Sequence, residues 1–381
     1  MNIGFATSIH PELHRVKDPC LPAGKYSSNH LLMEEEIYKL DENFEPRLID
    51  PKTEDSEEEK IEITLRPQNL GDFVGQKQIK EPLSISMEAA KKREEPIEHV
   101  LLYGNPGLGK TTLANIIAKE MNTNIKVTAG PALERVGDLA AILSNLEEGD
   151  VLFIDEIHRV NKTVEEVLYS AMEDYALDII IGKGPAARTL RMPLEKFTLI
   201  GATTKLNLLS SPLRDRFGHV YHLNFYEHKD IEKIVNRNAK LLDVAIHDDA
   251  IQTVAKRARR TPRVANRLLK RVRDYAQVRH DGIISQTVAH GALDLLNIDE
   301  HGLDEVDRKI LLNIIDKFNG GPVGLNTLSA AAAEEMDTIE TIYEPYLLQI
   351  GMIERTPRGR KTTKKACEHL DKEWIGQEGM L

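Results

Sequence analysis

A glycine-rich segment carries the residue types and the spacing that bind nucleotide phosphates. Gly107 and Gly109 let the backbone approach a phosphate closely, because neither residue has a Cβ. Lys110 follows at once and can reach the β- and γ-phosphates, while the hydroxyl of Thr111 can hold Mg²⁺. Thr112 is the next candidate residue for nucleotide binding. The pattern G-x-x-x-x-G-K-[ST] therefore predicts a site for ATP and Mg²⁺.

The sequence on both sides of this segment supplies the setting that the pattern requires. Residues 100–103 are an apolar run typical of a buried strand, and Leu113, Ile116 and Ile117 recur at helical spacing. A glycine-rich turn without function would not need a strand before it and a helix after it. The context favours a phosphate-binding loop whose bound phosphates lie at a helix N-terminus.

A second apolar run, at 151–154, ends in two carboxylates. Asp155 can support Mg²⁺, and Glu156 can orient or deprotonate an attacking water. An acidic pair after a strand alone is more often a helix cap. Because this acidic pair follows a phosphate-binding loop in the chain, we favour a catalytic role for it over a helix cap.

Two further segments predict residues that sense or neutralise the γ-phosphate. The strand that begins at 197–200 ends in hydroxyl groups, of which Thr204 is the first candidate for a sensor and Thr203 the alternative. Arg216 lies in a loop soon afterwards, where it can act as an arginine finger from a neighbouring subunit or simply pair with Asp215.

These residues must be positioned by elements that alternate between strands and helices. The pattern predicts an α/β fold: a P-loop ATPase domain at 61–225, in which helices flank a parallel sheet. Helices alone follow at 226–298, as expected of a small lid domain. Three helices and a short hairpin at 299–381 predict a winged helix. Residues 1–60 lack spaced apolar residues and are expected to be a disordered acidic extension.

Composition narrows the class of protein. The chain has 381 residues, a formal net charge of −11 and 41% hydrophobic residues, and no apolar run approaches the length of a membrane span. Cys20 and Cys367 match neither a disulfide framework nor a metal spacing, so we expect a cytoplasmic protein. Met33 opens the acidic part and is a candidate native start.

Together the motifs closely resemble the RuvB family of the AAA+ ATPases. The resemblance covers about residues 61–370 and rests on long motifs in a fixed order. These are LRPQNLGDFVGQ at 65–76, GNPGLGKTTLANIIAKEM at 104–121, GDVLFIDEIHRV at 149–160, YSAMEDYALDIIIGKGPAARTLRM at 169–192, FTLIGATT at 197–204, SPLRDRFG at 211–218, TPRVANRLLKRVRDYA at 261–276, DKFNGGPVGL at 316–325 and RTPRGR at 355–360.

The resemblance implies an ATP-driven motor that promotes branch migration of Holliday junctions in recombination, DNA repair and the SOS response. It implies a homohexameric ring that pumps duplex DNA, targeted to the four-way junction by RuvA and followed by the RuvC resolvase. It also implies roles for single residues around the nucleotide. Leu65 and Arg66 would line the adenine pocket, Tyr226 would close over it, Arg216 would act in trans, and Arg263 would be the second sensor.

Two contact surfaces are implied in the same way. The hairpin at 172–192 would dock on RuvA, with Leu190 and Met192 as exposed apolar contacts; an ordinary buried hairpin would explain those two residues almost as well. The wing would contact DNA phosphates through three arginines: Arg355, Arg358 and Arg360.

The chain departs from the family pattern at three positions. Asn105 stands where proline is usual, Arg260 where glycine is usual, and Lys205 where arginine is usual. If Arg260 is left-handed, the substitution costs about 1–2 kcal/mol. Two other functions remain open at this point: a clamp-loader-like AAA+ machine, and a nucleotide-switched regulator whose winged helix reads DNA sequence.

Overall fold

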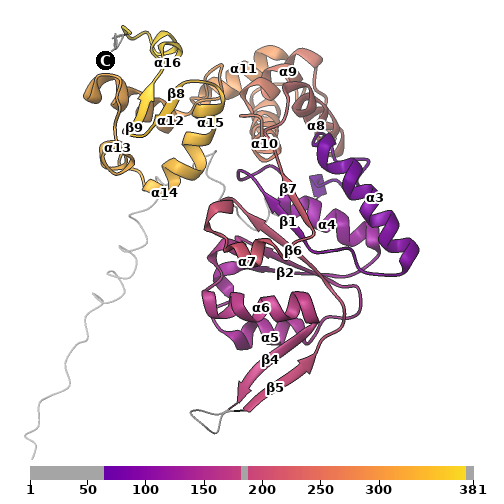
Figure 1. Ribbon diagram of the computed structural model, residues 1–381. Coiled ribbons are helices and arrows are strands. Elements are labelled where there is room, and N and C mark those ends of the chain that lie inside the picture. Colours follow the sequence, from indigo (N-terminus) through magenta and orange to yellow (C-terminus); the bar gives the residue numbers. More distant parts are fainter. Residues whose placement is uncertain (1–63, 182–187, 375–381) are drawn as a thin grey trace, which may run out of the picture. The chain divides into compact units, whose positions relative to one another are not determined.

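The computed structural model describes residues 64–181 and 188–374 (Figure 1). All of them belong to one compact unit, Arg47–Leu381. The predictions for the acidic extension and for Met33 lie outside the described residues. A search of the described ranges finds no helix that could span a bilayer.

A parallel sheet forms the centre of the first domain. Its strands lie in the order β2-β3-β6-β1-β7, and every neighbouring pair is parallel. Their bounds are β1 Val100–Tyr103, β2 Ile125–Ala129, β3 Val151–Asp155, β6 Thr198–Thr203 and β7 His219–His222. The strands expected from the apolar runs at 100–103, 151–154 and 197–200 are confirmed as β1, β3 and β6, and β7 is an edge strand of the sheet.

Helices cover both faces of this sheet because the strands are apolar on both sides. Leu102 and Phe153 face one core, which includes helices α3 and α4, while Leu101 and Ile154 face the other, which includes α5, α6 and α7. Figure 1 shows the two groups of helices on opposite sides of the strands. The bounds are α3 Lys77–Arg93, α4 Lys110–Met121, α5 Val136–Leu143, α6 Lys162–Asp174 and α7 Ser211–Arg214. Short 3₁₀ turns lie at η1 Gly130–Ala132, η2 Ile157–Arg159 and η4 Leu206–Leu208.

An antiparallel hairpin follows α6 and projects beyond the sheet (Figure 1). It consists of β4 (Ala176–Ile181) and β5 (Arg188–Pro193), with Leu177 opposite Met192 and Ile179 opposite Leu190. The expected hairpin at 172–192 therefore begins later, because residues 172–174 still belong to the helix.

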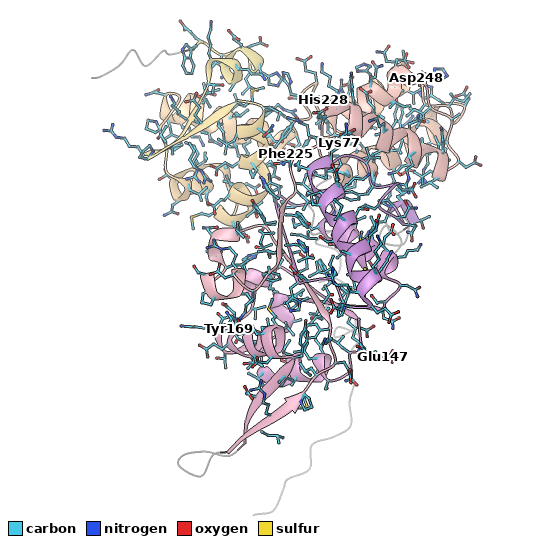
Figure 2. The ribbon with its side chains drawn as sticks, turned by 45° about the vertical axis from the view of Figure 1, so that its right-hand side comes forward. Lys77, Glu147, Tyr169, Phe225, His228 and Asp248 are labelled. Atoms are coloured by element: carbon cyan, nitrogen blue, oxygen red, sulfur yellow. The ribbon has the colours of Figure 1, made fainter. Side chains whose placement is uncertain are left out.

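The lid domain is entirely helical, as expected. Phe225 and His228, both labelled in Figure 2, mark the passage of the chain from the sheet into this domain. The helices are α8 His228–Leu241, α9 Asp248–Arg257, α10 Pro262–Arg279 and α11 Gln286–Leu295. Buried Leu268 and Val272 of α10 belong to the same core as α8, α9 and α11.

The last domain, called the head below, is a winged helix with its own core. Its helices are α12 Glu305–Leu312, α13 Leu325–Ala332, α14 Met336–Thr338, α15 Glu344–Gln349 and α16 Lys364–His369, and its wing consists of β8 Ile353–Thr356 and β9 Gly359–Thr362. Two π-helical turns, η5 Asn313–Lys317 and η6 Ile339–Tyr343, continue α12 and join α14 to α15. The fold class predicted from the sequence is confirmed.

Candidate active site

A cavity of about 950 Å³ lies at the carboxyl ends of the central strands. The phosphate-binding loop, the end of β3, the end of β6, the lid and the head all contribute to its lining. Every nucleotide-site residue expected on the chain's own side lines it: Leu65, Arg66, Gly107, Gly109, Lys110, Thr111, Thr112, Asp155, Glu156, Thr204, Tyr226 and Arg263. The structure thus brings together residues that lie up to 198 positions apart, from 65 to 263.

The two loop glycines are required by both backbone and space. Gly107 has φ 76° and Gly109 has φ 99°, in the left-handed region that side chains rarely adopt. A Cβ at Gly107 would lie 3.0 Å from Cβ of Arg263, and one at Gly109 would lie 3.3 Å from the ring of Phe73. The loop can therefore approach a phosphate and the lid at the same time.

Lys110 is buried at the start of α4 and turns back onto the loop. Its Nζ donates to the carbonyl oxygens of Gly104 at 2.7 Å and Asn105 at 2.9 Å. Burial lowers its pKa to about 8, against the opposing effect of Asp155 and Glu156. The ammonium is held next to the carboxylates, in a place where a phosphate group would favour its charged form. Asn105, which replaces the usual proline, contributes a carbonyl group to this arrangement.

Asp155 ends β3, and Glu156 begins the next turn in a left-handed conformation with φ 50°. The amide of Glu156 donates to Oδ1 of Asp155 at 2.9 Å. Oε2 of Glu156 lies 3.5 Å from Nε2 of His158, a residue that the sequence reading did not single out. The other nitrogen of that ring, Nδ1, lies 2.9 Å from the Thr203 hydroxyl. A chain of polar contacts therefore joins the carboxylate of Glu156 to the end of β6.

The two threonines at the end of β6 have different environments. Thr203 is fully buried, and its hydroxyl accepts from the amide of Lys205 at 3.0 Å as well as contacting His158. Thr204 is partly exposed and lines the cavity. The geometry favours Thr204 for contact with a ligand and gives Thr203 a positioning role.

Leu65 and residues of the lid line the cavity together. Leu65 is buried, and its carbonyl oxygen accepts from Nη1 of Arg237 on α8 at 2.9 Å. The Tyr226 hydroxyl donates to the carbonyl oxygen of Leu108 at 3.1 Å, and burial raises its pKa. Tyr226 therefore connects the lid to the phosphate-binding loop directly.

Arg260 lies immediately before the Thr-Pro-Arg helix start and is left-handed, with φ 54°. The cost of about 1–2 kcal/mol expected for a side chain in that conformation therefore applies. Its Nε donates to the Tyr226 carbonyl oxygen at 2.7 Å, and the Tyr226 amide donates to the Arg260 carbonyl oxygen at 3.0 Å. This reciprocal pair offsets part of the cost.

Arg216 does not line the cavity formed by its own chain. Its guanidinium donates to the Pro212 carbonyl oxygen at 2.7 Å and to Glu173 at 2.9 Å, and lies 4.5 Å from the ring centroid of Tyr169 on α6. The expected alternative, a salt bridge to Asp215, is wrong, because the guanidinium pairs with Glu173 instead. The cavity is formed without this arginine.

The head contributes to the cavity, which the sequence reading did not foresee. Asp337, Thr341 and Ile342 line it, and Lys205 forms ion pairs with Asp337 and, at 3.9 Å, with Glu340. These residues carry no local signal of nucleotide binding, and only the tertiary structure brings them there. The lysine after the sensor strand thus links that strand to the head.

A buried ion pair joins the lid to the head. The guanidinium of Arg259 donates to the two carboxylate oxygens of Asp307 at 3.0 and 3.3 Å, and the side chains are 4% and 0% exposed. The guanidinium also lies 4.8 Å from the ring centroid of Tyr346. Burial raises the pKa of Asp307, while the charge of Arg259 opposes the increase. Arg259 lies four positions before Arg263, which lines the cavity, so the ion pair attaches the head close to the start of α10.

The three wing arginines are not equivalent. Glu344 is buried, and its carboxylate accepts from Arg355 at 2.7 Å and from Arg360 at 2.9 Å. The Arg360 side chain is only 12% exposed, against 51% for Arg355. Arg358 is exposed in the turn between the strands. Glu344 therefore holds the Arg360 guanidinium against the head, and the expected contact of Arg360 with DNA stays a prediction.

The two apolar residues of the hairpin also differ. Leu190 is 52% exposed on β5, as a contact residue should be. Met192 is partly buried and packs against the core that includes α6, as the alternative of a buried hairpin predicts, and its contact with a partner stays a prediction. The alternation of side chains along a strand does not predict this difference in exposure, because Leu190 and Met192 lie on the same face of β5.

The donor set fits a nucleotide triphosphate with a divalent ion. The loop amides, Lys110 and Arg263 provide positive charge, while the Thr111 hydroxyl and Asp155 are oxygen donors of the kind that Mg²⁺ binds. The left-handed glycines keep the loop open to phosphate oxygens, since a Cβ at either position would crowd it.

Comparison with known proteins gives consistent results along the chain. Three family models match in order: the Holliday junction DNA helicase RuvB P-loop domain over residues 65–223, the RuvB AAA lid domain over 226–299 and the RuvB C-terminal winged helix domain over 300–371. The Holliday junction branch migration complex subunit RuvB of Dehalococcoides mccartyi is 58% identical over 315 residues, which are 83% of this chain and 90% of the relative.

Solved structures agree with the sequence comparisons. The RuvB Holliday junction branch migration motor of Thermotoga maritima is 54% identical, with a TM-score of 0.75 and coverage of 81% of this chain and 99% of that chain. A single-residue variant of the same Thermotoga protein, at 54% identity and the same coverage, gives a TM-score of 0.76.

Proposed function

The chain belongs to the RuvB family of AAA+ ATPases, and we propose that it is a DNA motor subunit that drives branch migration of Holliday junctions with ATP. Membership confirms the resemblance read from the motifs and favours this function over a clamp loader or a sequence-reading regulator. The observation that carries the proposal is one cavity lined by a phosphate-binding loop, a catalytic carboxylate pair, a lid and a winged-helix head.

The residues of the cavity divide the chemistry of ATP hydrolysis among them. Lys110 would leave the carbonyl oxygens of Gly104 and Asn105 to bind the β- and γ-phosphates. Thr111 and Asp155 would hold Mg²⁺, which neutralises charge on the phosphate oxygens when it is bound.

The attacking water requires a base and an orienting group. Glu156 would accept its proton, with His158 holding the carboxylate in place from one side. Thr204 would contact the γ-phosphate or the water, and Arg263 would face the phosphates from the lid. Because α10 carries Arg263, a change at the γ-phosphate would reach the lid through this helix.

Arg216 supports a site that is shared between subunits. Its guanidinium lies outside its own cavity, at the surface formed by α6 and α7. In a ring, this surface could face the nucleotide of the next subunit, and an arginine supplied in this way accelerates phosphoryl transfer by about 10³–10⁵. We therefore propose a closed ring, with six subunits as the family resemblance implies.

DNA contact is assigned to the exposed part of the wing. Translocation must work on any sequence, so the contacts should be made to phosphates and should weaken with salt. Arg358 and Arg355 would contact the backbone, while Arg360 and Glu344 would position the wing. The connection from lid to head through Arg259 and Asp307 would carry the motion of the nucleotide site to this surface.

The remaining partners follow from the family. RuvA would dock on the hairpin of β4 and β5 through Leu190, and RuvC would resolve the junction after migration. The proposed place of action is the cytoplasm, in recombination, repair and the SOS response.

The function is tested by dissociation of a synthetic four-way junction by the full chain, with and without RuvA. The expected result is ATP-dependent separation into two duplexes, stimulated by RuvA and absent in a Glu156→Gln variant that still binds ATP. If ATP hydrolysis proceeds but the junction stays intact with RuvA present, the motor function is wrong. If the chain instead binds one DNA sequence more tightly than unrelated sequences, the result would favour the nucleotide-switched regulator.

A further inference from the structure

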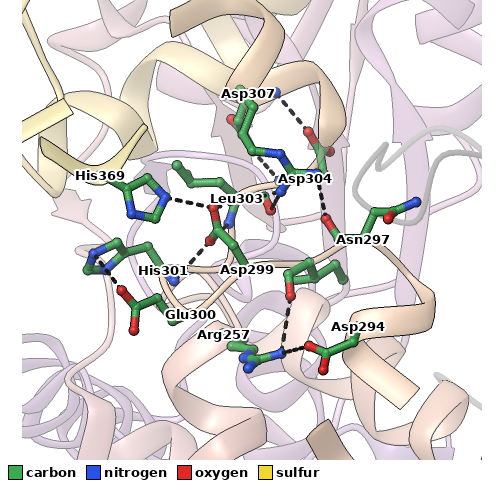
Figure 3. Close-up of polar contacts among 12 residues, drawn as sticks. Arg257, Asp294, Asn297, Asp299, Glu300, His301, Leu303, Asp304, Asp307 and His369 are labelled. Atoms are coloured by element: carbon green, nitrogen blue, oxygen red, sulfur yellow. Dashed lines mark hydrogen bonds and ion pairs between the residues drawn. The ribbon is translucent and has the colours of Figure 1, made fainter. Parts of the chain in front are cut away.

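Two histidines and a glutamate meet at the junction between the lid and the head. Glu300 and His301 lie in the loop between α11 and α12, and His369 is the last residue of α16. One donor atom from each lies within 4.8 Å of the other two. Figure 3 shows the three side chains together, far along the sequence from the nucleotide-binding loop.

His369 is held in the orientation and tautomer that a metal ligand needs. Its Nε2 lies 2.8 Å from Oδ2 of Asp299, and the carboxylate can only accept, so Nε2 carries the proton. The lone pair of Nδ1 is then available. Asp299 is itself fixed, because its Oδ1 accepts from the amides of His301 and Leu303, both at 2.9 Å (Figure 3). A carboxylate behind a histidine is the usual support of a metal-bound imidazole.

His301 is fixed through its backbone and its ring. Its carbonyl oxygen accepts from the Tyr346 hydroxyl at 2.6 Å, and its ring lies edge-on to the ring of His369 with centroids 4.7 Å apart. A neutral imidazole at this place offers the lone pair of one ring nitrogen to an ion.

Glu300 is exposed and completes the donor set. Its Oε1 lies 3.9 Å from Nε2 of His301. Donors around a tetrahedral zinc ion are about 3.3 Å apart, as follows from metal–ligand distances of about 2.0–2.1 Å. Rotation of the exposed Glu300 side chain can bring its carboxylate closer to the imidazoles.

We propose that Glu300, His301 and His369 bind a divalent ion of the zinc class, with the fourth position open to water. Two imidazoles and one carboxylate suit zinc and related transition metals, whereas Mg²⁺ and Ca²⁺ prefer oxygen donors alone. The site is separate from the Mg²⁺ position at Thr111 and Asp155. A bound ion would fasten the loop that leaves the lid to the last helix of the head.

The test is titration of the full, tag-free chain with Zn²⁺ by calorimetry after treatment with a chelator. One ion per chain should bind, and Co²⁺ in its place should give the visible absorption of a four-coordinate site. His301→Ala and His369→Ala should each weaken binding at least tenfold, and Asp299→Asn should weaken it about tenfold. His228→Ala, on the exposed start of α8, is the matched control and should leave the affinity unchanged.

Glu300→Gln distinguishes loss of metal binding from loss of folding, since this exposed residue can change without disturbing the core. It should also weaken Zn²⁺ binding while the unfolding of the chain, followed by Trp374 fluorescence, stays the same. The proposal is overturned if no ion binds with a dissociation constant below about 100 μM. It is equally overturned if the histidine variants match His228→Ala. Neither outcome would affect the ATPase assignment, because the readout is metal binding alone.

Discussion

The ion pair of Arg259 and Asp307 offers a quantitative test of the connection between lid and head. Asp307→Asn preserves the shape of the side chain and one carbonyl oxygen, but it removes the negative charge. The guanidinium of Arg259, 4% exposed, then lies in the interior without its counter-charge. Removing one partner of a buried pair costs about 3–5 kcal/mol. Because the asparagine keeps one oxygen that can accept from Arg259, we expect the free energy of unfolding to fall by about 3 kcal/mol, the lower end of this range.

Urea denaturation can measure this loss, because Trp374 is the single tryptophan of the chain and lies at the end of the head. With a slope of about 2 kcal/mol per M, a loss of 3 kcal/mol lowers the midpoint by about 1.5 M. Adding Arg259→Met should restore most of the midpoint, because the double variant no longer buries an unpaired charge.

Asp316→Asn is the matched control. Asp316 pairs with Lys372 at 2.9 Å, but both side chains are exposed to solvent, at 48% and 37%. Its loss should be below about 1 kcal/mol. The reasoning is refuted if Asp307→Asn lowers the midpoint no more than this control, or if Arg259→Met fails to restore it.

Three other predictions test the nucleotide site and the wing. Glu156→Gln should lower ATP turnover about 10²-fold or more while ATP affinity, measured by calorimetry, is unchanged; retained turnover would exclude a base at this position. Because the pKa of Lys110 is lowered to about 8 and bound phosphate should raise it, ATP binding at pH 8 should take up about half a proton. Calorimetry in buffers of different ionisation enthalpy measures this uptake, which should disappear in Lys110→Arg and below pH 7. Arg358→Ala should reduce the salt dependence of DNA binding by about one phosphate contact without lowering stability. Arg360→Ala should instead destabilise the head, since it weakens the pairing of buried Glu344; equal effects of the two changes on DNA binding and on stability would contradict the assignment.

Sequence predicts the local parts of this molecule well. The strand before the phosphate-binding loop, Val100–Tyr103, has the predicted bounds, because a fully buried strand is a continuous apolar run. The edge strand His219–His222 was missed, since it is short and carries only one aliphatic residue. The carboxylate pair and the cavity-lining threonine follow from their positions at strand ends.

Some roles of single residues cannot be predicted from sequence, because they depend on contacts between segments that are distant along the chain. His158, between Glu156 and Thr203, is an ordinary polar residue until the turn places it there. The contribution of Thr341 to the nucleotide cavity requires the head to lie against the sensor strand. For the same reason, sequence does not show that Arg360 pairs with the buried carboxylate of Glu344 in the head.

We propose that each nucleotide site is completed by Arg216 of a neighbouring subunit. Arg216→Ala lacks the finger but keeps its own phosphate-binding loop, and Lys110→Ala lacks the loop lysine but keeps the finger. Each variant alone should be nearly inactive in steady-state ATP hydrolysis with DNA present.

Mixed in equal amounts, the two variants should regain about a quarter of the wild-type rate, because about one interface in four then pairs an intact loop with an intact finger. Activity that stays at the average of the two variants at every mixing ratio would contradict a shared site.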